Sequence, residues 1–163
     1  MNVLYYFFNM ISIDTKHETD DHLSHDCPFC DFIRGKGEFH KIYETDKLLA
    51  FLSNHPLEEG HILIIPKYHG EQLHNIPDKY LRDIMPLASK MAEIVFASKS
   101  VDYNILQNNG TKARQRVKHV HFHIVPKIDE KEGLILHGNC KKLPREKMEK
   151  IASNHKEQLS KVL

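Results

Sequence analysis

Three histidines alternate with apolar residues in the segment 119–125, which reads His-Val-His-Phe-His-Ile-Val. Successive side chains of a β-strand point to opposite faces, so a strand here places His119, His121 and His123 on one face. The intervening apolar side chains then point to the other face and into a core. The pattern predicts a strand over residues 117–125, ended by Pro126, with one face made of imidazoles.

This histidine face has three interpretations. A solvated polar face is disfavoured because the intervening residues are all apolar. A metal site made of all three histidines is disfavoured because neighbours on one strand face lie about 6.6 Å apart and converge poorly on a tetrahedral ion. The remaining interpretation is catalytic: an imidazole attacks phosphorus and forms a covalent nucleotidyl-histidine, which divides one difficult step into two.

The apolar residues elsewhere predict short strands and one long helix in no repeating order. Strands are expected at residues 41–44, 48–52, 61–65 and 103–107. Apolar residues at three- and four-residue steps predict an amphipathic helix from Pro77 to Ser100, which Pro86 should kink or split. Shorter helices are expected at residues 27–34 and 144–163. This mixture predicts an α+β fold on a largely antiparallel sheet.

The length of 163 residues suits one domain with terminal extensions. We expect an N-terminal extension at residues 1–25, partly disordered, a domain at residues 26–130, and a tail with a helix at residues 131–163. The apolar run at residues 3–8 is too short to cross a bilayer, and no Lys or Arg precedes it, which disfavours a signal peptide. We therefore expect no membrane partner. A net charge of +1 likewise argues against a nucleic-acid partner.

Cys27 and Cys30 have the spacing that zinc prefers for two thiolate ligands. His69 and His119, distant in the sequence, would complete a structural tetrahedral Zn²⁺ site with them. The alternatives are a redox pair or two unligated thiols, and a redox pair is disfavoured because nothing strand-like precedes Cys27. Cys140 stands alone, and three cysteines are too few for a disulfide framework. The cysteine content therefore favours a reducing compartment, namely the cytoplasm, or also the nucleus in a eukaryote.

A basic segment lies immediately before the histidines. It follows the turn-forming Asn108-Asn109-Gly110 and carries four cations within seven residues: Lys112, Arg114, Arg116 and Lys118. One interpretation is a solvated loop. The other is a positively charged entrance to a binding site, which attracts a phosphate group. The sequence alone leaves both open.

Four ordered motifs together resemble the histidine triad family. The first is the histidine segment 119–125, and the second runs from Ala50 through Gly60-His61 to Pro66-Lys67-Tyr68-His69. The third is Cys27-Pro28-Phe29-Cys30, and the fourth is Asn108-Asn109-Gly110 with Gln115. The resemblance covers roughly residues 27–130. It is strongest to the nucleoside phosphoramidate hydrolase branch, since Val120 stands where another branch has proline.

This resemblance implies a fold, an activity and roles for individual residues. The fold would be an α+β half-barrel that forms a homodimer through its long helix and a continuous sheet. The activity would be hydrolysis of purine nucleoside phosphoramidates, with His121 as nucleophile and His123 and His61 beside it. Structural Zn²⁺ would be bound by Cys27, Cys30, His69 and His119. The substrate-binding positions would be Leu48, Phe51, Ser53, Asn54, Asn108, Gly110, Gln115 and Arg116.

Three places depart from the family pattern. The chain has no tryptophan, and its tail from Ile128 does not match that of the animal members, on which substrate choice partly depends. Ser53 stands where members usually carry an aspartate that grips the ribose, which affects ribose affinity or sugar choice. Arg114 and Arg116 stand where small residues often flank the glutamine, which favours a more anionic substrate. A dinucleoside polyphosphate hydrolase is therefore the alternative enzyme. A nucleotide-binding module with little turnover is the non-catalytic alternative, against which the intact His121 argues.

Overall fold

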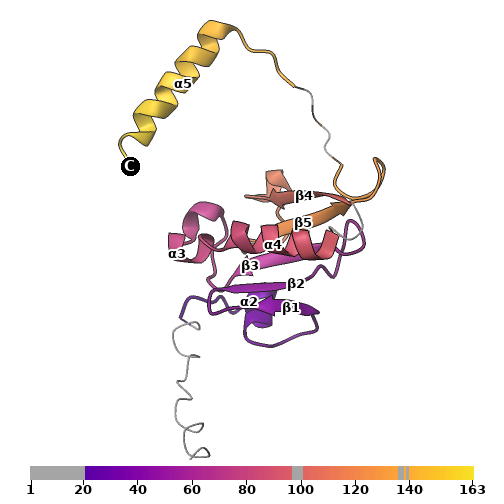
Figure 1. Ribbon diagram of the computed structural model, residues 1–163. Coiled ribbons are helices and arrows are strands. Elements are labelled where there is room, and N and C mark those ends of the chain that lie inside the picture. The colour runs from indigo at the N-terminus through magenta and orange to yellow at the C-terminus, as the bar shows by residue number, and fades with distance from the viewer. Residues whose placement is uncertain (1–20, 97–100, 136–137, 139) are drawn as a thin grey trace, which may run out of the picture.

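The computed structural model describes residues 21–96, 101–135, 138 and 140–163, so most of the expected N-terminal extension lies outside the described residues. Five strands form one antiparallel sheet in the order β1-β2-β3-β5-β4 (Figure 1). Their bounds are β1 Lys41–Glu44, β2 Leu48–Leu52, β3 Ile62–Pro66, β4 Asp102–Gln107 and β5 Phe122–Lys127. With the helices described below, this sheet confirms the α+β prediction.

Side-chain alternation along β2 and β3 divides the core between the two faces of the sheet. One face packs against helix α4 (Ile84–Phe96) and takes Leu48, Ala50, Ile62 and Ile64. The other packs with the short helix α2 (Pro28–Ile33) and takes Leu49, Phe51, Leu63 and Ile65. Because both faces are covered, β2 and β3 are apolar at nearly every position. The α2 side of the sheet carries the candidate site described below.

The segment predicted as one helix from Pro77 to Ser100 is divided into α3 (Asp78–Leu81) and α4. The split confirms that the helix is interrupted, but the break falls before Pro86, which lies in the first turn of α4. A proline is tolerated there because the N–H groups of a first turn have no partner within the helix. The Leu87 N–H that follows donates to the Asp83 carbonyl at 3.0 Å, so the helix continues normally. The predicted end of the helix, residues 97–100, lies outside the described residues.

Strand β5 begins later and ends later than the sequence predicted. It starts at Phe122, because the preceding segment binds elsewhere: the Val120 N–H donates to the Gly70 carbonyl at 2.8 Å. It continues through Pro126, which pairs with Tyr103 of β4. Pairing of β5 with β3 extends only to Ile124, so β3 does not pair with the far end of β5, where a residue without an N–H is tolerated.

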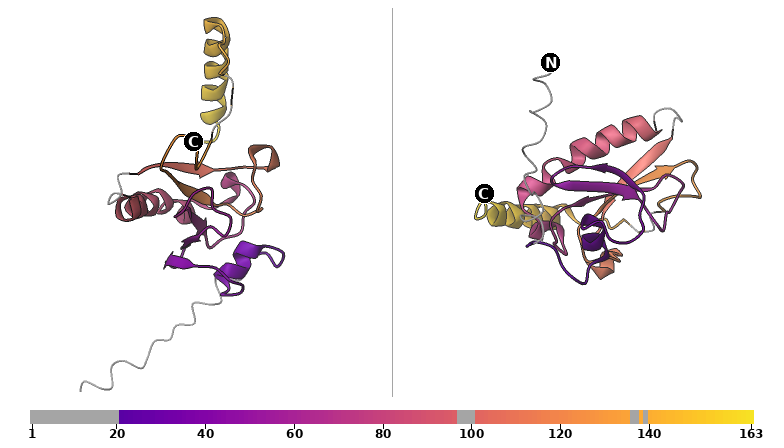
Figure 2. Two further views of the ribbon diagram at one scale, coloured as in Figure 1. Left: turned by 90° about the vertical axis from the view of Figure 1, so that its right-hand side faces the viewer. Right: turned by 90° about the horizontal axis from the view of Figure 1, so that it is seen from below.

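The C-terminal tail ends in helix α5 (Arg145–Leu159), which confirms the helix predicted there. No residue of α5 is buried, and Figures 1 and 2 show the helix standing clear of the sheet. Two 3₁₀ helices, η1 (Leu73–Asn75) and η3 (Thr111–Ala113), lie in the connections. Among the residues that the structure describes, no helix has both the length and the apolar character needed to cross a membrane.

Candidate active and metal site

The three histidines of the 119–125 segment point to one side of the sheet, although only His123 belongs to β5. The imidazoles of His121 and His123 lie 4.8 Å apart between centroids, and that of His119 lies 5.3 Å from His69. His119 and His121 are 0% and 5% exposed. The predicted histidine face is therefore present, but most of it is built by the chain before the strand.

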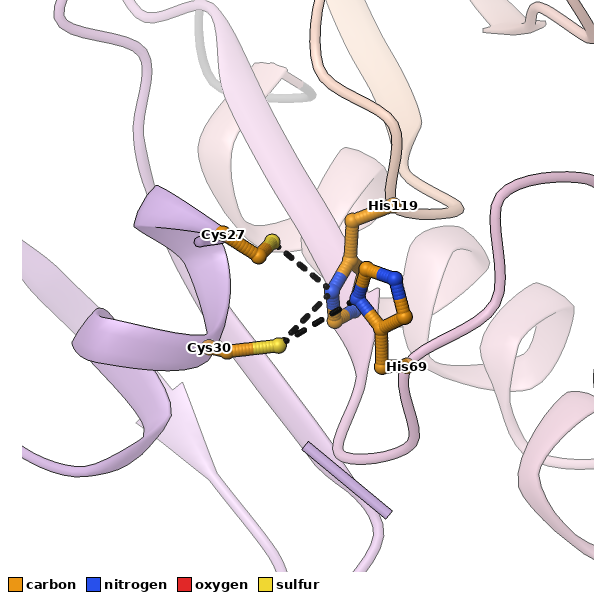
Figure 3. A group of neighbouring side chains, drawn as sticks. All are labelled: Cys27, Cys30, His69 and His119. Atoms are coloured by element: carbon orange, nitrogen blue, oxygen red, sulfur yellow. Dashed lines mark hydrogen bonds between the residues drawn. The ribbon is translucent and has the colours of Figure 1, made fainter. Parts of the chain in front are cut away.

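Four side chains form a compact group beneath α2 (Figure 3). Cys27 and Cys30 come from the start of α2, His69 follows β3, and His119 precedes β5. Their ligand atoms, two sulfurs and two ring nitrogens, all lie within 4.8 Å of one another. The Nδ1 atom of His119 lies 3.5 Å from each sulfur, and that of His69 lies 3.4 Å from Cys30. The four residues could therefore bind a metal ion, which is the set that the sequence predicted.

The protonation states of Cys27 and His119 in this group favour the binding of a cation. A hydrogen bond from the Cys30 thiol lowers the pKa of Cys27 to about 3, and the same contact, with burial, raises the pKa of Cys30. The Nε2 atom of His119 lies 2.9 Å from the Pro66 carbonyl, which can only accept, so Nε2 carries the proton. The lone pair of His119 is then on Nδ1 and faces the two sulfurs. A metal ligand needs this tautomer.

His121 is fixed by a contact with the neighbouring main chain. Its Nδ1 donates to the His119 carbonyl oxygen at 2.6 Å. The neutral imidazole then carries its lone pair on Nε2. Burial lowers the pKa of His121, and the hydrogen bond to His119 offsets only part of that effect. A neutral imidazole with a free Nε2 can act as a nucleophile.

His61 and His123 form a second, connected pair. The Leu57 N–H donates to His61 Nδ1 at 3.1 Å, so His61 must carry its proton on Nε2. That Nε2 donates to His123 Nδ1 at 2.9 Å, which leaves the His123 proton on its own Nε2. Burial, with a smaller effect from neighbouring imidazoles, lowers the pKa of His61 to about 4 and that of His123 to about 3. The pair is therefore neutral near pH 7.

A polar loop lies between β4 and β5, where the sequence predicted phosphate contacts. The Gln115 side chain closes it: its oxygen accepts from the Gly110 N–H at 2.6 Å, and its amide group donates to the Glu71 carbonyl. Gly110 has φ +83°, and Arg114 has φ +64°, a left-handed conformation unusual for a residue other than glycine. Both arginines beside Gln115 are exposed.

The remaining residues predicted to bind substrate do not all lie on the same face of the sheet. Phe51 lies on the α2 side of the sheet, in the same cluster as Phe29. Ser53 and Asn54 lie in the connection that leads to His61, and the Ser53 N–H donates to the His61 carbonyl at 2.9 Å. Leu48 is fully buried against α4, on the opposite face of the sheet. It was wrongly predicted to line the pocket, because alternation along β2 turns it away from the histidines.

Phe29 is a site residue that the sequence analysis missed. Its ring lies 5.3 Å from that of His121 and 5.9 Å from that of His119, edge to face in both cases. Its place between Cys27 and Cys30 was the available signal, because a residue between two ligands of a site must lie near that site.

A cluster of neutral imidazoles beside a Cys/His group, on one face of a five-stranded antiparallel sheet, defines a histidine-triad type of α+β protein. The family model described as the HIT domain matches residues 34–130. The chain belongs to this family.

Proteins of similar sequence and structure match this chain over most of its length. Adenosine 5'-monophosphoramidase HNT1 of Saccharomyces cerevisiae is 48% identical over 136 residues, 83% of this chain and 82% of that protein. The HNT1 of Candida albicans is 43% identical over 141 residues, 83% of this chain and 93% of that one. A crystal structure of the histidine triad nucleotide-binding protein from Candida albicans superposes with a TM-score of 0.80 at 43% identity. The superposition covers 84% of this chain and 99% of the Candida albicans chain.

Proposed function

We propose that the protein hydrolyses purine nucleoside phosphoramidates, with His121 as a covalent nucleophile. The observation that carries the proposal is the hydrogen bond from His121 Nδ1 to the His119 carbonyl, which leaves Nε2 unprotonated in a buried group of neutral imidazoles. The similarity to two proteins named adenosine 5'-monophosphoramidase supports this substrate class.

In the first step, the Nε2 lone pair of His121 forms a bond to phosphorus while the P–N bond to the amine breaks. The departing amine takes up a proton from solvent. In the second step, water attacks the same phosphorus and releases a proton to solvent, the bond to Nε2 breaks, and the nucleoside monophosphate leaves. We assign His123 the task of holding the phosphoryl oxygens or the leaving group through its Nε2–H. His61 keeps that proton in place by donating to His123 Nδ1.

The polar positions near the histidines are assigned to the nucleotide. Phe51, Ser53 and Asn54 are proposed to contact the nucleoside, and Asn108, Gly110 and Arg116 the ribose-phosphate. Gln115 uses its side-chain oxygen and amide group within the chain, on Gly110 and Glu71. We therefore assign Gln115 the task of holding the 110–115 loop in shape.

Zinc is proposed as the resident metal of the Cys27, Cys30, His69 and His119 group. A tetrahedral zinc ion with its usual bond lengths separates sulfur from nitrogen ligands by about 3.6 Å. Three of the four sulfur–nitrogen pairs, Cys27–His119, Cys30–His119 and Cys30–His69, lie 3.4–3.5 Å apart, and the donor set of two thiols and two imidazoles is one that zinc prefers. Bound there, zinc would tie α2 to the segments after β3 and before β5, and it would supply structural stability.

A homodimer with a continuous sheet is also proposed. β4 is at the edge of the sheet and exposes Tyr103 and Ile105, and Met85 of α4 is exposed. Met91 of α4 is buried in the chain's own core, so the edge strand and Met85 carry this proposal. Light scattering should give twice the mass of one chain. A mass equal to one chain would contradict the proposal.

The alternative activity is hydrolysis of dinucleoside polyphosphates. It is favoured by the exposed cations of the 110–118 loop and by the left-handed backbone of Arg114, since strained residues often lie at functional sites. We further propose a reducing compartment such as the cytoplasm, because Cys27, Cys30 and Cys140 form no disulfide in the described part of the chain.

One assay separates these functions. The purified protein is given an adenosine phosphoramidate and, in parallel, a dinucleoside tetraphosphate, and kcat/KM is measured for each. We expect the phosphoramidate to be the better substrate. We also expect His121→Ala to lower its turnover by at least about a thousandfold while nucleotide affinity stays nearly intact. A wild-type kcat in that variant would place the nucleophile elsewhere, and no turnover of either substrate by the wild-type chain would favour the non-catalytic module.

A further inference from the structure

His119 connects the metal group to the nucleophile through the main chain. Its Nδ1 faces both cysteine sulfurs at 3.5 Å, and its Nε2 donates to the Pro66 carbonyl. Its own carbonyl oxygen accepts the hydrogen bond from His121 Nδ1. A shift of His119 therefore moves the carbonyl acceptor that selects the His121 tautomer with a free Nε2.

Phe29 makes a second connection, through side chains. It lies on α2 between the two cysteines and is 7% exposed. The edge-to-face contacts with His119 and His121 have interplanar angles of 75° and 80°. The helix that supplies both thiols thus also supplies an aromatic wall against the nucleophile.

Phe32 provides a comparison within the same helix. Its ring contacts Phe29, Phe39 and Phe51, which belong to the apolar cluster beneath α2. Of these two aromatic residues, Phe29 is the one whose described ring contacts include imidazoles. A general loss of packing under α2 can therefore be separated from a loss of the contact with His121.

We propose that the metal group is a positioning device for the nucleophile, with Phe29 as a positioning residue. An ion bound by Cys27, Cys30, His69 and His119 holds α2 against the segment before β5. This maintains the contact between the rings of Phe29 and His121, and it maintains the hydrogen bond from His121 Nδ1 to the His119 carbonyl oxygen. An ion that only stabilised the fold would leave the His121 ring unchanged in the chain that remains folded.

The inference rests on the proposed function for its kinetic test, so the first experiment has a second readout. Metal-loaded protein labelled with ¹⁵N-histidine reports which His121 nitrogen is protonated, and the same samples give kcat and KM. We expect Phe29→Leu to lower kcat about tenfold or more with little change in KM, and to mix the two His121 tautomers. The control Phe32→Leu should lower Tm by a similar amount and leave both kcat and the His121 spectrum unchanged.

A second experiment removes the metal from the wild-type chain with a chelator under conditions in which it stays folded. We expect the His121 nitrogen signals to shift toward a tautomer mixture, while those of the exposed His74 stay constant. Unchanged His121 signals in both Phe29→Leu and the stripped protein would overturn the proposal. If Phe29→Leu does not fold, Phe29→Met replaces it. If no phosphoramidate is turned over, the proposed function fails, but the nitrogen spectra still decide whether the metal group positions His121.

Discussion

The Nε2 atom of His61 lies 2.9 Å from the Nδ1 atom of His123, although 62 residues separate them in the chain. The register of β3 against β5 produces this pair. Leu63 is opposite His123, so His61, two residues earlier on the same face, is a diagonal neighbour of His123. The sheet therefore selects the proton position on His123 without any group outside the chain.

This pair leads to a prediction for His61. Replacing it in His61→Phe keeps a ring of similar size but removes the donor to His123 Nδ1, so the His123 proton is no longer confined to Nε2. We expect kcat/KM for the phosphoramidate to fall about a hundredfold. The exposed His74→Phe is the control and should retain wild-type activity. A loss smaller than about threefold in His61→Phe would mean that the pair has no part in the reaction.

The metal group gives a prediction for stability. Cys27→Ser removes one thiolate from a buried set of four ligands, so the chain should lose its bound ion and its Tm should fall by at least about 5 °C. Affinity for nucleotide should change less than Tm. Cys140→Ser is the matched control, because Cys140 is an exposed free thiol. Metal analysis should find one zinc per wild-type chain. The finding of none, with a Tm that a chelator does not change, would refute the zinc assignment.

Much of the fold was readable from local sequence patterns. The Lys41–Glu44 and Leu48–Leu52 strands appear with the predicted bounds because a turn at residues 45–47 separates two apolar runs. The short helix after Cys27 also appears, with Pro28 at its start and Gly35 in a left-handed conformation after its end. The histidine face was predicted by alternation alone, since period two holds even where the chain is not hydrogen-bonded as a strand.

What could not be predicted depends on partners distant in the chain. Strand β5 starts at Phe122 because Val120 binds the Gly70 carbonyl, and no local pattern announces that contact. Leu48 was predicted to bind substrate but faces α4, because a strand that is apolar at every position does not indicate which face of the sheet each side chain occupies. Phe29 was overlooked because its contact with His121 exists only once α2 lies against the sheet.

The buried histidines predict a dependence of stability on pH. Burial lowers the pKa of His61 to about 4 and that of His123 to about 3, whereas an imidazole in the unfolded chain has a pKa of about 6.5. Below pH 6.5 the unfolded chain therefore binds more protons than the folded chain, and stability falls as pH falls. The loss continues until the pH reaches the folded pKa values. Each histidine contributes at most about 1.4 kcal/mol per pH unit.

Chemical denaturation at several pH values between 7 and 4 measures this loss. We expect His61→Phe to have a flatter decline than the wild-type chain, because the proton-binding difference that His61 contributes is gone. The exposed His40→Phe should leave the slope unchanged. Parallel curves for all three proteins would show that His61 does not titrate as its burial requires.

The basic loop predicts a dependence on salt. Arg114 and Arg116 are exposed on either side of Gln115, whose side chain holds the 110–115 loop closed. If they attract the phosphate groups of the substrate, KM should rise with ionic strength while kcat changes little. The double variant Arg114→Ala with Arg116→Ala should lose most of that rise. Lys141→Ala with Lys142→Ala removes the same charge from the exposed tail and should keep it. An unchanged salt response in the double arginine variant would place both side chains away from the phosphate, and it would remove the main reason to consider a polyphosphate substrate.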